Sequence, residues 1–257
     1  VAVWSDGYTG FHGSITAKGG VLGGDGGFVE TSGHYLNTAG SYINTLAVAG
    51  KTGTWLLDPS DIFINNNPTT ASSGTNSYSN NATNSNLNVT DLTNALALNN
   101  ITVLTTDTGT GGNGDIFVDA EINWSANTTL TLSAYRNITA NQSIINTGNG
   151  SVNLIADNTG TGTGTVSFAP TKNVNLSGGT GVVNIFYNPT VFGTQDVIYT
   201  GGTTPTQYML INSLGSSGDT TTRSLASLSN SSALWGGNYA LAKDIDATDT
   251  INWNGGA

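Results

Sequence analysis

A repeat of alternating apolar residues in the middle of the chain constrains its fold most. Three segments, TLTLSA (129–134), SVNLIA (151–156) and NVNLSG (173–178), align with their apolar positions superposed. Each step is 22 residues (152 − 130 and 174 − 152). The positions that coincide at this step are Leu130, Val152 and Val174; Leu132, Leu154 and Leu176; Ile116 and Ile138; and Ile122, Ile144 and Val166.

The alternation predicts short strands that each bury one face. A repeat of this length is too short for two antiparallel hairpins but fits one coil of a parallel β-solenoid. Equivalent strands of successive coils then stack roughly 4.8 Å apart. The repeat therefore predicts an all-β fold, a β-solenoid whose coils have the length of the repeat.

Glycine clusters mark the expected corners of these coils. In GGDGGFVETSG (23–33) the glycines immediately precede Phe28-Val29, as Gly13-Ser14 precedes Ile15-Thr16. Glycine adopts backbone angles that are closed to other residues, which tight corners require. We interpret this stretch as a turn that leads into a strand and not as a ligand-binding loop.

The chain divides into coils and two insertions. In the first insertion we expect a solvated loop at 65–88 and a short helix with Leu92, Ala95 and Leu96 on one face, capped by Thr90 or Asp91; in the second we expect a helix over 222–228. Both insertions are followed by a strand and the triplet INW, at 122–124 and 251–253. The predicted units are coils 1–64, loop and helix 65–100, coils 101–212, loop and helix 213–238, and the start of further coils 239–257.

Composition excludes several functions. Only 9% of residues are charged, against about 25% in a typical soluble domain, and the net charge is −10. Six Lys and Arg cannot form a patch for nucleic acid or anionic membrane. The chain has no cysteine for disulfides, and no apolar run reaches the roughly 20 residues of a membrane span. Because Val1 opens directly in strand-like sequence, we expect an internal fragment of a longer protein.

Motifs for cofactors and metals are incomplete. Gly109, Gly111 and Gly114 match G-x-G-x-x-G, but the strand-like Asp115–Val118 follows where a dinucleotide site needs a helix. Gly50-Lys51-Thr52 fails as a phosphate-binding loop because residue 45 is Thr45. GGNGD (111–115) lacks the spacer of a calcium-binding nonapeptide, and GGDGGF (23–28) has Phe28 in place of the acid.

Catalytic candidates are few and have simpler interpretations. A nucleophilic arrangement of Ser32 and His34 with Asp25 or Glu30 is less favoured than a corner histidine that bonds locally. Carboxylate pairs for glycosidic hydrolysis are less favoured than turn residues that bond backbone amides; these pairs are Asp58 with Asp61 and Asp244 with Asp246. Tryptophan could form platforms for sugar rings, with Trp55 expected in the core; the candidates are Trp4, Trp55, Trp124, Trp235 and Trp253. We therefore predict no catalytic, cofactor-binding or metal site, and no cofactor.

Four phrases carry a resemblance to a known family. They are WSDGYTGFHGSITAKGG (4–20), GGFVETSGHYL (26–36), GKTGTWLLDPSDIFI (50–64), and YMLINSL followed by GGNYALAKDIDA and WNGG near the end. In this order they resemble the filamentous-haemagglutinin-like adhesins, which Gram-negative bacteria export by two-partner secretion. The two insertions look longer than that family leads us to expect.

The resemblance implies a right-handed parallel β-helix that forms the rod of an extracellular surface adhesin. It also implies export through an outer-membrane barrel transporter, and binding to glycans or proteins of a host, bacterium or matrix. Homotypic association, end to end or lateral, remains open. Two alternatives also remain: a carbohydrate-active β-helix enzyme, and an ice- or crystal-surface binder suggested by the run Thr161–Thr165.

Overall fold

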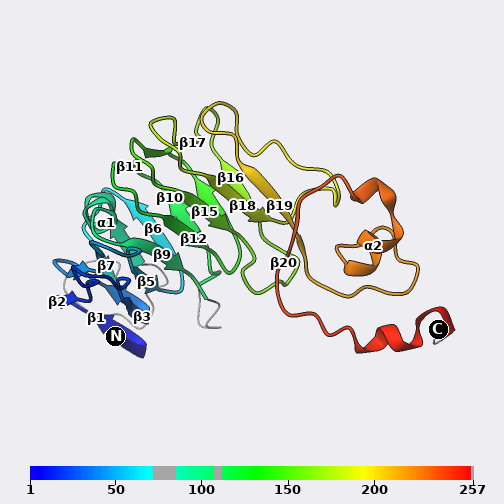
Figure 1. Cartoon of the computed structure of the whole chain (residues 1–257), viewed down its shortest axis with the longest axis horizontal. Helices are drawn as coiled ribbons and strands as arrows, with labels where there is room; N and C mark the ends of the chain where they lie inside the picture. The colour runs from blue at the N-terminus through cyan, green and yellow to red at the C-terminus, as the bar shows by residue number, and fades with distance from the viewer. Residues whose placement is uncertain (72–84, 107–111, 256–257) are drawn as a thin grey trace.

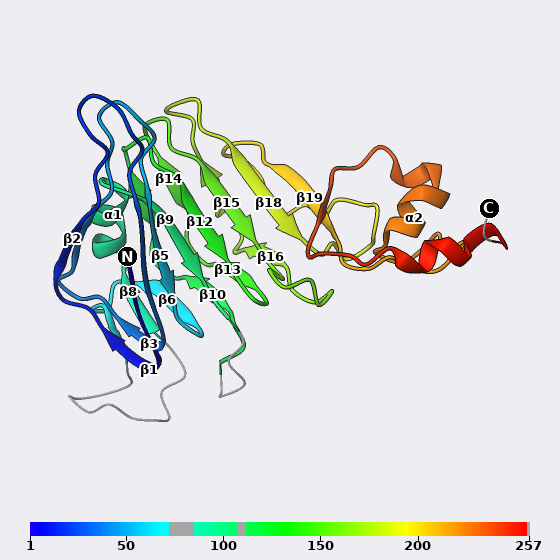
Figure 2. The ribbon, with the colours of Figure 1, turned by 60° about the horizontal axis from the view of Figure 1, so that its bottom comes forward.

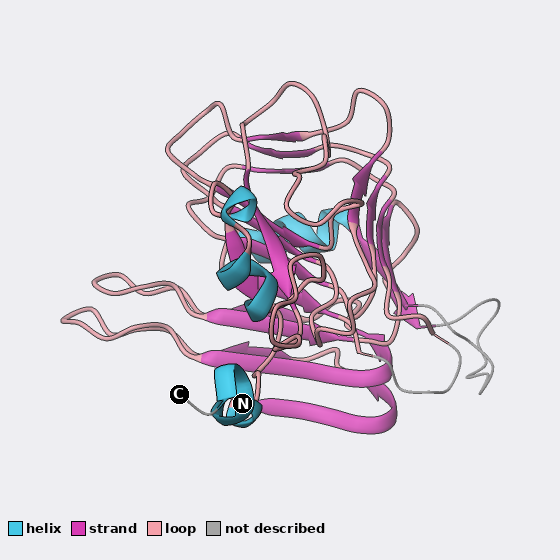
Figure 3. Cartoon of the chain, turned by 90° about the vertical axis from the view of Figure 1, so that its right-hand side faces the viewer, coloured by secondary structure: helices cyan, strands magenta, loops and turns pink. Residues whose placement is uncertain are grey.

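The fold consists mainly of parallel strands in stacked sheets, with few helices (Figure 1). The computed structural model describes residues 1–71, 85–106 and 112–255. The strands lie on separate sides of a common interior, as the view along the stack shows (Figure 3). This arrangement confirms the prediction of stacked parallel sheets.

The largest sheet has nine strands, and every neighbouring pair in it is parallel (Figure 2). Strands that follow one another in this sheet are separated in sequence by the rest of a coil. Their order is β1 (Ala2–Gly10), β3 (Phe28–Asn37), β5 (Thr54–Asp58), β9 (Asn100–Leu104), β12 (Leu130–Ser133), β15 (Val152–Ile155), β18 (Val183–Tyr187), β19 (Thr206–Ile211) and β20 (Tyr239–Leu241).

Three smaller sheets complete the coils. The six-stranded sheet has the order β16 (Val166–Phe168), β13 (Ile138–Ala140), β10 (Ile116–Val118), β6 (Ile62–Asn65), β8 (Ser85–Asn88) and β7 (Thr70–Ala71). The others are β11 (Ile122–Trp124), β14 (Ile144–Asn146) and β17 (Val174–Asn175), and the pair β2 (Ser14–Thr16) and β4 (Tyr42–Asn44). Among the pairs of named strands in the described residues, only β7–β8 is antiparallel.

Every second side chain of these strands enters one continuous hydrophobic core. Leu130 and Leu132 of β12 are fully buried, and the neighbouring strand adds Val152 and Leu154, which are also fully buried. Intervening residues such as Asn153 point outward and are half-buried. Each strand thus contributes one apolar face, and burial of these stacked faces drives folding.

The 22-residue step relates two successive coils and then ends. Leu130 pairs with Val152, and the bond from Asn153 Nδ2 to Thr131 Oγ1 spans 22 positions. Val152 next pairs with Val183, and the corresponding bond from Asn184 to Asn153 spans 31 positions. The predicted uniform repeat is therefore wrong beyond β15.

The residues that misled the alignment belong to other sides of the coil. Val174 of β17 pairs with Ile144, and Val166 of β16 pairs with Ile138. A loop between β15 and β16 lengthens this coil, and the buried carboxylate of Asp157 accepts hydrogen bonds from the loop residues Thr161 and Gly162. Apolar alternation is the same on every side of a coil, so it did not reveal which side a strand occupies.

One corner of the coils is held by carboxylate and amide side chains that bind the next coil. Asp61 Oδ1 accepts the Asp115 N–H at 2.8 Å, and Asp115 Oδ1 accepts the Asn137 N–H at 2.9 Å. Asn137 Oδ1 accepts the Thr165 N–H at 3.0 Å. The Arg136 guanidinium also pairs with the Asp115 carboxylate. Backbone groups at this corner are satisfied between coils, as buried amides require.

The first insertion is more ordered than predicted. Helix α1 (Val89–Leu96) begins after Asn88, whose side chain accepts the Thr90 N–H, so neither predicted cap is the N-cap. Leu92 and Leu96 are buried, as predicted, and Ala95 packs against the core. The predicted loop is wrong at 85–88, where β8 pairs in parallel with β6 and buries Leu87. Residues 72–84 of that predicted loop lie outside the described residues.

The second insertion contains a short helix, but its sequel differs from the prediction. Helix α2 (Leu225–Asn230) follows the cap Ser224, three residues later than the predicted start, and η1 (Ser232–Leu234) follows it. Strand β20 then joins the large sheet. The triplet at 251–253 lies in the 3-10 helix η2 (Thr248–Gly255), whereas the triplet at 122–124 forms β11. The predicted return to coils therefore fails after β20, because few residues beyond it are buried.

Glycine lets the coils approach one another closely. A Cβ placed on Gly26 would lie 1.7 Å from the Thr45 carbonyl oxygen, and one on Gly181 would lie 1.8 Å from that of Gly150. Such contacts exclude any side chain. The described part of GGDGGFVETSG thus forms a corner and the strand β3, as the sequence predicted.

Candidate functional site

A polar cleft opens on the outward face of the large sheet, where β1, β3 and β5 lie side by side. Its volume is about 200 Å³. Trp4 pairs with Ser32, and Ser32 pairs with Asp58, so the register places these three residues in one row across the strands. The cleft is lined by Trp4, Ser5, Asp6, Ser32, Gly33, His34, Asp58, Pro59, Ser60 and Thr106.

Hydrogen bonds fix several side chains around this cleft. Ser32 Oγ donates to Glu30 Oε1 at 2.5 Å, and His34 Nδ1 lies 2.6 Å from Ser60 Oγ. The Thr106 hydroxyl donates a longer bond of 3.5 Å to Asp58 Oδ1. These contacts join residues of two coils, so the polar wall is held by the fold itself.

The electrostatics of the cleft centre on Asp58. Burial is the main cause that raises the pKa of Asp58 from 3.8 to about 6, and the nearby charge of Glu30 raises it further. The hydrogen bond from Thr106 acts in the opposite direction. A carboxyl group with this pKa exchanges its proton near neutral pH, which is a property of acid–base groups as well as of buried polar contacts.

A β-bulge in β1 shapes the rim of the cleft. Ser5 pairs with Gly33 and Tyr8 pairs with Tyr35, so β1 has one extra residue between these points. The Ser5 hydroxyl donates to the Tyr8 carbonyl at 2.8 Å across the bulge. Bulges redirect side chains beside functional sites, and this one brings Asp6 to the cleft.

The nucleophilic arrangement considered for Ser32 and His34 does not assemble. Ser32 bonds to Glu30, while His34 bonds to Ser60, which is 26 positions away. Asp25 lies elsewhere, where its carboxylate accepts the Lys51 N–H at 2.8 Å. The prediction of a corner histidine is therefore right in kind, but its bond joins two coils and is not local in sequence.

The carboxylate pairs from the sequence also separate. Asp61 is buried and binds the backbone amides of Asn113 and Asp115, as the turn interpretation predicts. Asp58 alone of that pair lines the cleft. Asp246 accepts two bonds from Thr248, which lower the pKa of Asp246. Asp244, the other member of that pair, is exposed.

The juxtaposition of Glu30 and Asp58 was missed by sequence reasoning. A signal exists, because Phe28 of GGFVETSG pairs with Thr54 of GTWLLDP, each just after a glycine. Aligning Gly27 with Gly53 would have placed Ser32 beside Asp58. The 22-residue step does not apply there, so the alignment was not made.

The tryptophans divide into core and surface residues. Trp55 and Trp124 are buried, and the Trp55 indole donates to Thr31 Oγ1 at 3.0 Å. Trp4 and Trp235 are 63% and 68% exposed. Trp253 is half-buried. Trp4 is the exposed tryptophan that borders the cleft.

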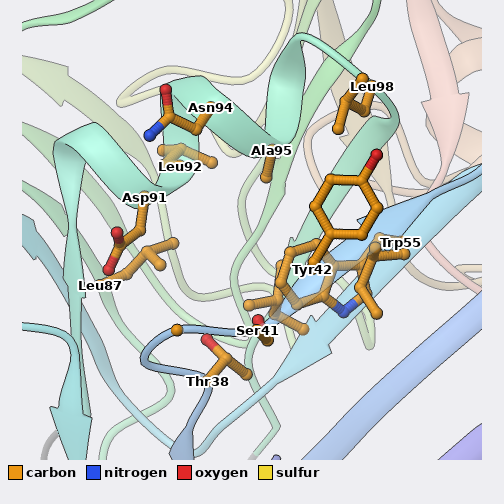
Figure 4. A pocket seen from close by; sticks show the side chains of 13 residues that line it. Thr38, Ser41, Tyr42, Trp55, Leu87, Asp91, Leu92, Asn94, Ala95 and Leu98 are labelled. Atoms are coloured by element: carbon orange, nitrogen blue, oxygen red, sulfur yellow. The ribbon is translucent and has the colours of Figure 1, made fainter. Parts of the chain in front are cut away.

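A second, mainly apolar pocket of about 190 Å³ lies beneath α1 (Figure 4). Its apolar lining comes from both the helix and the underlying strands. In Figure 4 the rings of Tyr42 and Trp55 lie on the side opposite the helix. The lining side chains include Ile43, Trp55, Leu57, Leu87, Leu92, Ala95 and Leu98.

The polar rim of this pocket is already engaged in part. Asp91 Oδ2 accepts the Thr69 hydroxyl at 2.5 Å, and Thr69 Oγ1 in turn accepts the Asn88 N–H. These bonds fix the first turn of α1. The pocket is thus a packing space between α1 and the first coils, and its polar groups serve the helix.

Cofactor and metal motifs have structural places in the fold. Gly109 and Gly111 of the dinucleotide pattern lie outside the described residues, and Gly114 occupies a turn with φ +70°. Within the ranges that the structure describes, no group of three or more His, Cys, Asp or Glu could hold a metal ion. In the same ranges, no helix combines the length and apolarity needed to cross a bilayer.

Comparisons with known proteins add no name to this geometry. No protein-family model matches the chain, and a search of curated proteins finds no significant match.

Proposed function

We propose that this chain is part of the rod of a secreted bacterial surface adhesin, and that it acts without catalysis. The carrying observation is the unbroken parallel order of the nine-stranded sheet, in which each coil stacks on the one before. Such quasi-one-dimensional stacks extend by adding coils and hold insertions away from the axis. The finer form that we propose is a right-handed β-helix with coils that begin at 22 residues and lengthen.

The outer surface suits a rod that works outside the cell. Its outward rows are joined by uncharged hydrogen bonds, such as Asn153 to Thr131 at 3.3 Å and Asn184 to Asn153 at 3.0 Å. Only 9% of residues are charged, so salt changes such a surface little. Many weak contacts along a repetitive surface give adhesion by avidity, without a deep pocket.

The resemblance in sequence supplies the setting of this proposal. We infer export through an outer-membrane barrel transporter of a Gram-negative cell and display at the cell surface. The partners would be glycans or proteins of a host, bacterium or matrix, and lateral contact between rods would support aggregation and biofilm formation. Neither nucleic acid nor membrane insertion has a part in this function.

Attachment of coated particles tests the proposal. Beads that carry the purified chain should adhere to epithelial cells, bacteria or extracellular matrix more than beads with a heat-denatured sample of the same chain. Soluble chain should compete with them. Equal attachment of native and denatured beads on all three surfaces would contradict the adhesive function.

A carbohydrate-active enzyme is the second candidate, and one observation favours it. Asp58 has a pKa raised to about 6 by burial and then by Glu30, and both carboxylates border a cleft with an exposed tryptophan. Glycosidases use such carboxyl pairs. Release of reducing sugar from a polysaccharide panel by the wild type, but not by Asp58→Asn, would establish this function and exclude the first.

The surface-binding alternative finds little support in the geometry. The run Thr161–Thr165 lies in the loop between β15 and β16. There the Thr161 hydroxyl donates to Asp157 and lies 2.9 Å from the Thr163 hydroxyl. These groups serve the loop and form no ladder on a flat sheet. We therefore keep two candidates only.

A further inference from the structure

We propose that the cleft between Trp4 and Asp58 binds a single sugar residue that carries no negative charge, at the end of a glycan. The proposal names the partner chemistry of the proposed adhesin, and it rests on that function for its biological role. The binding itself requires only the cleft.

The aromatic wall is the first reason. Trp4 is 63% exposed, although a tryptophan side chain normally gains by burial. Its backbone is fixed by pairing with Ser32 in a parallel sheet, so the ring is presented from a rigid element. An indole face offers apolar contact to the C–H face of a pyranose, while the hydroxyl groups of the sugar remain free for polar partners.

The polar wall supplies those partners. Asp58 is half-buried in the same row as Trp4, and the His34–Ser60 pair lies at the same cleft. Carboxylates are strong acceptors for hydroxyl donors because the bonds are charge-assisted. The side chains are also held in place by contacts between coils, so little ordering is required on binding.

Charge and size then narrow the ligand. The cleft is lined by Asp6 and Asp58, Glu30 lies close by, and no Lys or Arg belongs to its lining. Sulfated and uronic sugars would meet repulsion there. The volume of about 200 Å³ is below the roughly 300–1,000 Å³ of sites for drug-sized ligands, so one ring is the expected occupant.

Binding of methyl glycosides to the intact chain tests the proposal. We would measure saturation-transfer NMR and titrate intrinsic tryptophan fluorescence with methyl glucoside, galactoside, mannoside and N-acetylglucosaminide, and with glucuronic acid. At least one neutral sugar should bind. Trp4→Ala should weaken that affinity about fivefold or more, and Asp58→Asn about tenfold. Trp235→Ala is the matched control, since Trp235 is also an exposed tryptophan, and it should leave the affinity unchanged.

Three results would overturn the proposal: no neutral sugar binds, the Trp4 variant binds as well as the wild type, or glucuronic acid binds most tightly. Circular dichroism of each variant, with unchanged spectra required, separates these results from unfolding. Failure of the proposed function is distinguishable. Sugar binding without attachment of coated beads, or with hydrolysis of the sugar, supports the cleft and contradicts the non-catalytic rod.

Discussion

The side-chain oxygen of Asn99 accepts two hydrogen bonds from Thr45, one from its backbone N–H and one from its hydroxyl, both of 2.9 Å. The Asn99 amide nitrogen donates to the carbonyls of Ile43 and Ala95 at 3.0 and 2.9 Å. Asn99 is fully buried. One side chain thus joins the end of α1 to the coil that contains β4, and it satisfies backbone groups that no strand partner reaches.

Asn99→Ala should therefore destabilise the chain by about 3 kcal/mol, since the buried Thr45 N–H and the Ile43 carbonyl lose this partner. Chemical unfolding followed by circular dichroism measures this change. Asn94→Ala, on the exposed side of α1, is the control and should shift stability by less than about 0.5 kcal/mol. Equal effects of the two substitutions would show that Asn99 does not link the helix to the coils.

The direction of side chains in β15 yields a second prediction. Leu154 is fully buried, whereas the neighbouring Asn153 points outward and bonds to Thr131 and Asn184. Leu154→Asp should cost several kcal/mol more than Asn153→Asp, because it places an unpaired carboxylate in the core. Thermal melts of the two variants make the comparison, and equal shifts would be incompatible with the observed register.

The raised pKa of Asp58 predicts a pH dependence of stability. In the folded chain the pKa is about 6, mainly through burial, against 3.8 for a free carboxyl group. The folded state therefore holds this proton more tightly, and the stability it contributes below about pH 4 is lost as pH rises through 6. Asp58→Asn should gain stability relative to the wild type between pH 4 and 7.

Asp246 provides a control of opposite sign. Hydrogen bonds from Thr248 lower the pKa of Asp246, so its contribution is present at neutral pH and lost on acidification. Asp246→Asn should be less stable than the wild type at pH 7, and the difference should vanish in acid. Unfolding midpoints from pH 3 to 7 test both variants. If Asp58→Asn gained no stability over this range, the assigned environment of Asp58 would be wrong.

The outer strands of the large sheet predict association of the purified chain. β1 and β20 lie at the two ends of the strand order, so each pairs with one neighbour within the sheet. Open edges recruit other strands, and lysine on an edge opposes this. Ala2→Lys in β1 should reduce concentration-dependent association in light scattering, whereas Thr102→Lys in the central β9 should not. A wild-type chain that stays monomeric at high concentration and high salt would contradict this prediction.

Sequence alone could predict the stacked parallel sheets because alternation and glycine corners act locally. It placed Trp55 and Leu154 in the core and the first insertion at α1. It could not assign Val174 to its side of the coil, because each side shows the same apolar alternation and the loop after β15 changes the coil length. The second INW triplet failed for a related reason: the residues around Trp253 form a 3-10 helix although they repeat a strand sequence.

The candidate site was less predictable. Trp4, His34 and Asp58 were each noticed, but their meeting depends on the register between β1, β3 and β5 and on the bulge after Ser5. These features arise from pairing between distant segments. No pattern within one segment encodes them.

Disulfide trapping tests the register of the stacked coils most directly. The natural sequence has no cysteine, so a double variant contains only two thiols. Asn153 hydrogen-bonds to Asn184 in the structure, whereas a uniform 22-residue repeat would place Asn175 beside it. Neighbouring positions in paired strands lie within the Cα separation that a disulfide spans. We predict that Asn153→Cys with Asn184→Cys forms an intramolecular disulfide under mild oxidation, seen by thiol titration and non-reducing electrophoresis, and that Asn153→Cys with Asn175→Cys does not. Cross-linking of the second pair in place of the first would contradict the stacking described for this chain.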